Sequence, residues 1–359
     1  MTVLYVTDCE GPVSKNDNAF ELCGRFIPGG EEFFARVSRY DDFLADVVRR
    51  PGYKAGDTLK LILPFLKAHG LTDAAMEEFS RDSILLMPGA QRSLQRIAPL
   101  GPVYMVSTSY APYIRALCRV IGLPEERAYC TAVSLDRYPL AESDAELLRG
   151  LAREIAAMPL LEWPEGAAGP EDLGPSFRPV WERLEEIFWA RIPAMEIGAA
   201  YREVNPVGGS EKARAVAEIL EREGQPPGAA VYVGDSITDT AAFDLVRSRG
   251  GLALSFNGNR YALAHAELAC IAAHTLVLEV VARAFASGGR EAVLALVAGW
   301  ERGAWEEWLG PEDRVLWQEV YAGQTPLLAL ITPERSGDLV RASEAARKAV
   351  RGARIGALG

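Results

Sequence analysis

Short blocks of apolar residues alternate along this chain with longer segments in which apolar residues recur every three or four positions. The short blocks are rich in strand-forming side chains and cover residues 2–7, 103–106, 128–136, 229–233, 251–256 and 266–272. Such runs are typical of buried strands, and the periodic segments between them are typical of helices. This alternation predicts an α/β fold, a Rossmann-like doubly wound parallel sheet with helices on both faces.

The segment between the first two predicted strands has a helical pattern, with residues 58–69 as an example and Gly70 as its stop signal. An insert at this place starts and ends near the strand ends, so we expect a helical cap over a site there. A helical subdomain without a gating role is the alternative. The predicted organisation is a core of residues 1–15 and 101–275 with an insertion at about 140–200, a cap of residues 16–100, and a helical C-terminal extension of residues 276–359.

Two further segments stand out by composition. Residues 163–179 are dense in glycine and proline, which predicts a long loop that is either functional or a tolerated surface insertion. The C-terminal extension contains Trp300, Trp305, Trp308 and Trp317. Tryptophans at helical spacing more often pack in a core than form a ligand cage, and a homo-oligomer surface is the second interpretation.

Composition narrows the classes of partner. The 359 residues carry a formal net charge of −11, and this acidic excess argues against nucleic acid or an anionic membrane as the main partner. The sequence has no apolar run of about 20 residues, so we expect no membrane span. It enters a strand without a signal-like segment. The five cysteines include no CxxC pair, which predicts reduced thiols and a cytoplasmic protein.

Acidic or hydroxyl side chains directly follow three of the predicted strands. They are Asp8 and Glu10 after the first strand, Ser107 after the second, and Asp235 with Asp239 after the strand at 229–233. The carboxyl ends of parallel strands meet at one edge of a sheet, where ligands bind. We therefore expect these side chains to lie close together, although each one alone also has a structural interpretation as a turn or helix-capping residue.

These residue types suit a metal ion. Mg²⁺ prefers carboxylate, carbonyl and water oxygens as ligands. The candidate metal ligands are Asp8, Glu10 (with its backbone carbonyl), Asp235 and Asp239.

The remaining polar signals suit a phosphate group. Lys212 lies in the first turn of a predicted helix, where a positive charge is unfavourable unless an anionic partner is near. Ser107 and the backbone N–H groups around Thr108 and Ser109 are expected to bind phosphate oxygens at a helix N-terminus.

The order Asp8-Cys9-Glu10-Gly11, Ser107, Lys212 and Gly234-Asp235-Ser236-Ile237-Thr238-Asp239 resembles the haloacid dehalogenase (HAD) superfamily over roughly residues 1–275. The opening D-x-E-G-P is similar to an uncharacterised archaeal-type group of that superfamily. The resemblance implies that Asp8 is a nucleophile, Glu10 an acid and base, and Ser107 and Lys212 the second- and third-motif residues. It also implies that Asp235 and Asp239 form the acidic pair, and that Gly11 and Asn257 contribute to phosphate or substrate binding.

The function expected from this resemblance is that of an Mg²⁺-dependent phosphatase acting on a small phosphorylated metabolite through an aspartyl-phosphate intermediate. The alternatives are a phosphotransferase that uses a hydroxyl acceptor and a non-catalytic HAD scaffold or subunit of a larger assembly. A signalling receiver domain ranks lower because its acidic pair precedes its lysine. Glu10 stands where most phosphatases carry aspartate, which bears on rate and acceptor choice. Basic residues of the predicted cap either select an anionic substrate or form a solvated face; they are Arg49, Arg50, Lys54 and Lys60.

Overall fold

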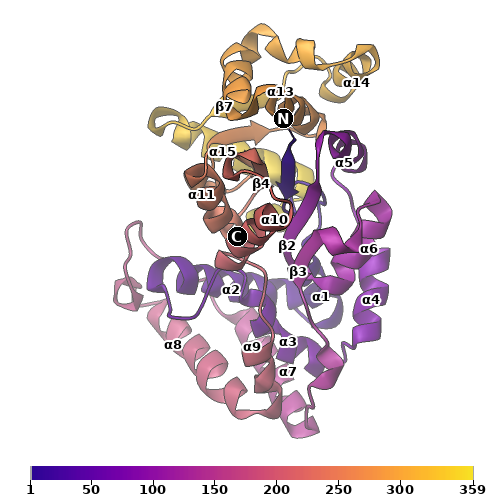
Figure 1. Ribbon diagram of the computed structural model, residues 1–359. Coiled ribbons are helices and arrows are strands. Elements are labelled where there is room, and N and C mark those ends of the chain that lie inside the picture. Colours follow the sequence, from indigo (N-terminus) through magenta and orange to yellow (C-terminus); the bar gives the residue numbers. More distant parts are fainter. Residues whose placement is uncertain (1, 359) are drawn as a thin grey trace.

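The computed structural model describes residues 2–358, and its centre is one seven-stranded sheet (Figure 1). The strands lie in the order β3-β2-β1-β4-β5-β6-β7. Their bounds are β1 (Leu4–Thr7), β2 (Val103–Tyr110), β3 (Ala128–Thr131), β4 (Ala230–Gly234), β5 (Leu252–Phe256), β6 (Leu268–Ile271) and β7 (Leu327–Leu330). The first six are parallel and β7 pairs antiparallel with β6. The six predicted strands are confirmed, and β7 was not predicted.

Helices cover both faces of the sheet, as the alternation predicted. Around β1, Tyr5 and the preceding Val3 face one layer while Leu4 and Val6 face the other, because successive side chains of a strand point to opposite faces. The first layer contains α5 (Ala90–Ile97), α6 (Ala111–Ile121) and α13 (Leu276–Gly299). The second contains α10 (Ser210–Arg222), α11 (Thr240–Ser248) and α12 (Arg260–His265). The α/β class of the fold is therefore as expected.

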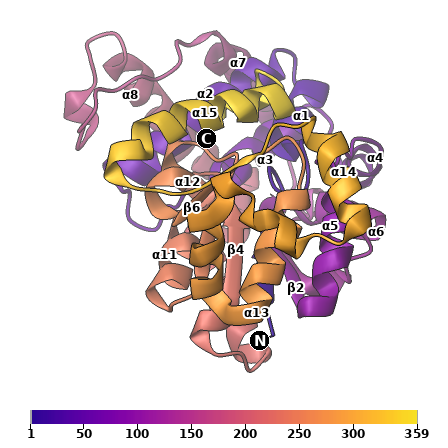
Figure 2. The same cartoon turned by 90° about the horizontal axis from the view of Figure 1, so that it is seen from above.

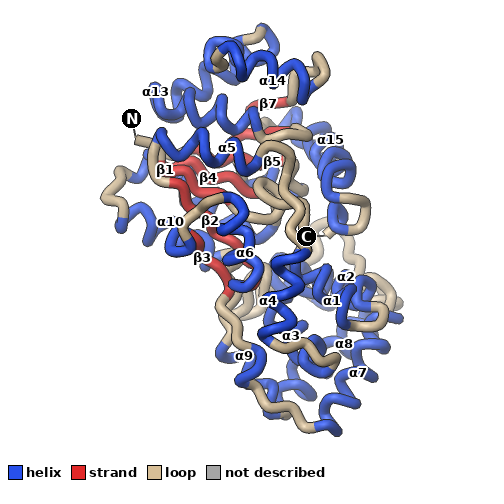
Figure 3. The backbone as a smooth tube through the Cα atoms, turned by 90° about the vertical axis from the view of Figure 1, so that its right-hand side faces the viewer, coloured by secondary structure: helices blue, strands red, loops and turns tan. Residues whose placement is uncertain are grey.

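A separate helical domain lies beyond the carboxyl ends of the strands (Figures 1 and 3). It consists of α1 (Asn18–Phe26), α2 (Gly30–Asp42), α3 (Thr58–Ala68), α4 (Asp73–Asp82), α7 (Glu142–Ala157), α8 (Arg178–Glu186) and α9 (Ala200–Glu203). Two stretches of sequence share one apolar core, in which Phe33 and Phe65 of the first pack with Leu148 and Phe188 of the second. Each stretch buries an apolar face that alone would be exposed to water.

The packing divides the chain differently from the predicted boundaries. The segment at about 140–200 completes the helical domain instead of belonging to the core around the sheet. Residues 90–97, which the prediction placed in the cap, form α5 and pack Ala90, Leu94 and Ile97 into the sheet core against α13. The glycine- and proline-rich stretch at 163–179 is anchored by buried Leu173, which packs with Phe43 of the helical domain.

The C-terminal extension does more than add helices. After α13, α14 (Pro311–Tyr321) packs against it through an aromatic cluster in which the rings of Trp305 and Trp317 stack with centroids 4.3 Å apart. The chain then adds β7 to the sheet edge and continues into α15 (Pro333–Arg351). Figure 2 shows α15 crossing above the sheet beside α2 of the helical domain. An ion pair of Arg354 with Glu31 in α2 links these two elements just beyond α15.

No helix within residues 2–358 is both long enough and apolar enough to cross a membrane.

Candidate active site

A cavity lies where β1, β2 and β4 end, between the sheet, the helical domain and α15. The sheet side contributes Asp8, Glu10, Ser107, Thr108, Ser109 and Asp235. The helical domain and its N-terminal connection contribute mainly acidic and hydroxyl side chains, namely Asp17, Ser38, Asp41, Asp42 and Thr58. Two arginines of α15, Arg347 and Arg351, complete the wall. The cavity therefore brings together segments from both ends of the sequence.

Asp8 sits directly after β1 and is almost fully buried. Its Oδ1 accepts a hydrogen bond from the backbone N–H of Cys9 at 2.7 Å, and its Oδ2 lies 2.7 Å from Nζ of Lys212. Burial raises the pKa of Asp8 to about 7, against the opposing effect of the Lys212 charge. Both oxygens are thus held in fixed directions at the floor of the cavity.

Lys212 and Asp239 form the most enclosed ion pair of the site. Nζ of Lys212 lies 2.7 Å from Oδ1 of Asp239, and neither side chain is exposed. Oδ1 of Asp239 also accepts a hydrogen bond from the hydroxyl of Tyr232 at 2.7 Å. Oδ2 accepts the backbone N–H groups of Asp235 and Ser236 at 2.9 and 3.0 Å. Four donors therefore occupy the Asp239 carboxylate, which fixes the turn after β4.

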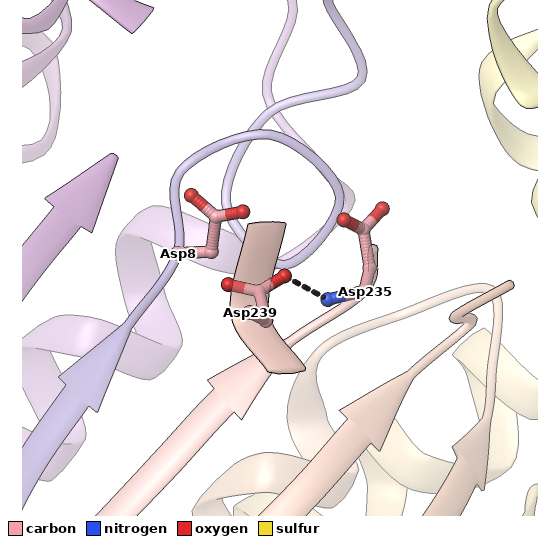
Figure 4. A group of neighbouring side chains, drawn as sticks. All are labelled: Asp8, Asp235 and Asp239. Carbon is pink, nitrogen blue, oxygen red and sulfur yellow. Dashed lines mark hydrogen bonds between the residues drawn. The ribbon is translucent and has the colours of Figure 1, made fainter. Parts of the chain in front are cut away.

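Asp8, Asp235 and Asp239 together form an acidic cluster (Figure 4). Each offers one carboxylate oxygen, and these oxygens lie within 4.8 Å of one another. Such a set of hard oxygen donors fits Mg²⁺. Because the Asp239 oxygens are already engaged by four donors, Asp8 and Asp235 are the better placed direct ligands.

The Glu10 side chain is not part of this cluster, so its carboxyl group is not grouped with the predicted metal ligands, whereas its backbone carbonyl stays a predicted ligand. Its Oε1 accepts hydrogen bonds from the backbone N–H of Asn18 at 2.8 Å and from the hydroxyl of Ser109 at 2.7 Å. These donors, at the start of α1 and the end of β2, hold the carboxyl group in the wall of the same cavity that contains Asp8. Burial, with a smaller effect of the Asp17 charge, raises the pKa of Glu10 to about 8. This shift favours the protonated form of Glu10 near neutral pH.

The hydroxyl segment after the second predicted strand differs from the expected helix N-terminus. Thr108 and Ser109 belong to β2, and α6 starts only at Ala111. The backbone N–H of Ser109 donates a hydrogen bond to Oγ of Ser107 at 3.1 Å. The hydroxyl of Thr108 donates to the carbonyl of Val207, also at 3.1 Å. The side chains of all three still line the cavity. The segment therefore contributes hydroxyl-bearing residues of a strand to the cavity rather than a helix N-terminus.

Gly11 and Asn257 have roles other than the predicted binding of phosphate. Gly11 has φ of +98°, and a Cβ there would lie 2.2 Å from Oδ2 of Asp235, so glycine permits the first turn to approach the cluster. Both side-chain amide atoms of Asn257 bond the backbone of Ala272, at 2.7 and 3.0 Å. Asn257 thereby ties the end of β5 to the segment after β6 and does not line the cavity.

The sequence prediction missed Arg347 and Arg351, as it also missed Asp17, Asp41 and Asp42 of the cavity wall. Nη1 of Arg351 lies 3.0 Å from Oδ2 of Asp235, and Arg347 forms an ion pair with the same oxygen. Both side chains are buried. Burial raises the pKa of Asp235 although these two arginines act in the opposite direction. The available signal was a four-residue spacing, since Leu339, Ser343, Arg347 and Arg351 are the buried residues of α15.

A solved structure with the same architecture is gene product AF1437 from Archaeoglobus fulgidus. It is similar to this chain with a TM-score of 0.81 and 28% sequence identity, and the match covers 100% of this chain and 99% of that one. The shared architecture therefore includes the C-terminal extension. No family model and no curated protein matches the sequence.

The basic residues of the predicted cap do not line the cavity. Arg50 pairs with Glu185 at 2.7 Å, and Lys54 and Lys60 both pair with buried Asp57, at 2.9 and 2.6 Å. Arg49 donates to the carbonyl of Asp46. The positive charge that faces the acidic cluster therefore comes from Lys212 and α15.

Proposed function

We propose that this protein is an Mg²⁺-dependent phosphohydrolase of the HAD superfamily that acts on a small phosphorylated metabolite. The observation that carries the proposal is the setting of Asp8. Its carboxylate lies in the cavity, is oriented by Lys212 and the N–H of Cys9, and belongs to a cluster of three aspartates. A carboxylate fixed in this way is suited to nucleophilic attack on a phosphoryl group.

Asp8 and Asp235 would hold the Mg²⁺, and Asp239 would position the turn and Lys212 through its four hydrogen bonds. When bound, the cation supplies neutralisation of the charge on the phosphoryl group and on the carboxylate that approaches it.

The reaction has two steps. In the first, a carboxylate oxygen of Asp8 forms a bond to phosphorus as the bond from phosphorus to the leaving oxygen breaks, and Glu10 gives its proton to that leaving oxygen. In the second, Glu10 takes a proton from water, which attacks phosphorus and releases inorganic phosphate and the Asp8 carboxylate. Because the pKa of Glu10 is raised to about 8, its carboxyl group can serve as the proton donor at neutral pH. Ser107, which lines the cavity, would donate a hydrogen bond to a phosphoryl oxygen.

The test is phosphate release from a panel of phosphorylated metabolites, with and without Mg²⁺, for the native protein and for Asp8→Asn. We expect Mg²⁺-dependent release that falls about 10⁴-fold or more in the variant, since the nucleophile is lost. Asp82→Asn is the matched control, because Asp82 is exposed at the end of α4. Equal release by native protein and Asp8→Asn would rule out Asp8 as the nucleophile.

One observation favours a second candidate, a non-catalytic HAD scaffold. Asp235 is already paired with two buried arginines, so the cluster is neutralised without a metal ion. Absence of phosphate release from every compound, with Mg²⁺ still bound, would favour this candidate. A phosphotransferase would instead be recognised by transfer to added acceptor alcohols at the expense of free phosphate.

A further inference from the structure

Two arginines from α15 stand in the wall of the cavity that contains Asp8. We propose that Arg347 and Arg351 bind the oxygens of the transferring phosphoryl group, so that the C-terminal helix supplies the anion-binding half of the active site. This inference rests on the proposed phosphohydrolase function and goes beyond it, since it assigns substrate binding to two residues outside the predicted motifs.

The first argument is position. Both guanidinium groups reach the same carboxylate oxygen, Oδ2 of Asp235, from residues that follow Asp235 by 112 and 116 positions. Both line the cavity together with Asp8 and Ser107. An anion that approaches the Asp8 carboxylate therefore meets the two arginines as part of the same wall.

The second argument is the hydrogen-bonding capacity that remains. A guanidinium group has five N–H donors. The two Nη atoms of Arg347 donate to Asp235 and to the carbonyl of Leu358, the latter at 3.3 Å. Its Nε is buried and has no hydrogen-bond partner within the described residues. A buried donor without a partner is costly, so this N–H group remains available to a ligand that reaches the part of the cavity wall formed by Arg347.

The third argument is charge. Without a metal ion, the carboxylates of Asp8, Asp235 and Asp239 face the same number of cations, namely Lys212, Arg347 and Arg351. Asp17, Asp41 and Asp42 also line the cavity, so an anion that approaches Asp8 meets several further carboxyl groups. A divalent cation adds two positive charges to this ion-paired group. Without the two arginines, Lys212 and the metal ion would be the remaining cations that oppose these carboxylates when a phosphate dianion binds.

The fourth argument is that the arginines are held in place. Nε of Arg351 donates to the carbonyl of Lys15 at 3.2 Å, and its Nη2 donates to the carbonyl of Asn16. One turn earlier on the same face of α15, the hydroxyl of Ser343 donates to the carbonyl of Gly258 at 2.6 Å. Planar guanidinium groups fixed in this way are well suited to phosphate oxygens.

The test is calorimetric titration of inorganic phosphate into the full-length protein in saturating Mg²⁺, for native protein, Arg347→Gln and Arg351→Gln. We expect each variant to bind phosphate about 10- to 100-fold more weakly, the range for loss of one hydrogen-bonding charge. Arg341→Gln is the matched control, because Arg341 lies on the same helix with 75% of its side chain exposed. Mg²⁺ affinity, titrated separately, is expected to stay equal or to increase in the two variants.

A second substitution, Arg347→Lys, keeps the charge and loses the fork of donors, so an intermediate loss of phosphate affinity is expected. Phosphate affinity equal to that of native protein in Arg347→Gln and Arg351→Gln would overturn the inference while leaving Asp8-dependent hydrolysis intact. Loss of Mg²⁺ and phosphate affinity together would also overturn it, since the arginines would then only position Asp235. Native protein that hydrolyses substrate but binds no phosphate would be a third contrary result.

Discussion

Asp239 and Asp235 lie four residues apart in the same turn, yet their surroundings differ. Asp239 is held by four donors that come from β4, the turn itself and the start of α10. Asp235 is held by two arginines from α15. The first carboxylate is a fixed part of the sheet edge, whereas the second meets charged partners from a distant helix. Under the proposed function, this difference separates a carboxylate that positions its neighbours from one that binds the metal ion.

The largest expected effect comes from removing Lys212, the cation that holds Asp239. Lys212→Met removes the cation shared by Asp8 and Asp239 and leaves buried carboxylates without compensation. Removal of one partner of a buried ion pair typically costs about 3–5 kcal/mol of stability. Urea unfolding followed by circular dichroism measures this loss, and Lys348→Met, at an exposed position of α15, is the control. A loss equal to that of the control would contradict the fixed character of Asp239.

Glu10 provides the next test, because it stands outside the acidic cluster. Glu10→Gln keeps the shape of the side chain and removes its proton transfer, so we expect activity to fall at least about 10²-fold. With the pKa of Glu10 raised to about 8, native activity should decline above that pH as the acid loses its proton. The pH profile of kcat/KM for the native protein and the variant checks both points. An unchanged alkaline limb in Glu10→Gln would assign that limb to another group.

Two variants, Asp235→Asn and Asp239→Asn, test which of the two carboxylates binds Mg²⁺ directly. If Asp235 is the direct ligand, its variant should lose more Mg²⁺ affinity, while the Asp239 variant should lose about 10- to 100-fold, as is typical for a residue that orients ligands. Calorimetric titration with Mg²⁺ measures both. A larger loss of Mg²⁺ affinity in Asp239→Asn would make Asp239 the direct ligand and Asp235 the positioning residue.

The smallest expected effect is on the pH dependence of stability. The pKa values of Asp8 and Glu10 are about 7 and 8 in the folded protein, above the unfolded values near 4, so the folded state holds more protons between these limits. This contribution to stability is complete below about pH 4 and is lost as pH rises through 7 to 8. In metal-free protein, Asp8→Asn should reduce the loss between pH 5 and 8 by about 2–3 kcal/mol. Thermal unfolding at both pH values with EDTA checks this, and an unchanged slope would contradict it.

The sequence predicted those parts of the fold that follow from local patterns. Six strands were identified because each is a short apolar run, and their parallel arrangement explains why Asp8, Ser107 and Asp235 line one cavity. The pattern of a helix shows that one face is buried but not what covers it. The union of residues 135–204 with the first helices in one domain was therefore not predicted.

The arginines were missed for a related reason. Residues 333–351 contain many charged residues, so Arg347 and Arg351 did not differ by type from exposed neighbours such as Arg341. Asn257 shows the opposite case, since a residue type that suits binding is used to join two segments of backbone. The type and order of residues were enough to predict the acidic cluster. The partners of single polar side chains were not predictable, because they come from residues far away in the sequence.

The late position of Arg347 and Arg351 has a consequence for synthesis. Strands β1, β2 and β4 and both segments of the helical domain leave the ribosome long before α15 does. Until residue 351 has been translated and has emerged, a nascent chain that has already formed its sheet holds Asp235 without its two counter-charges. A premature stop codon shortly before residue 347 would spare every strand and still remove both. The site therefore has its full set of paired charges only after the ribosome has translated α15.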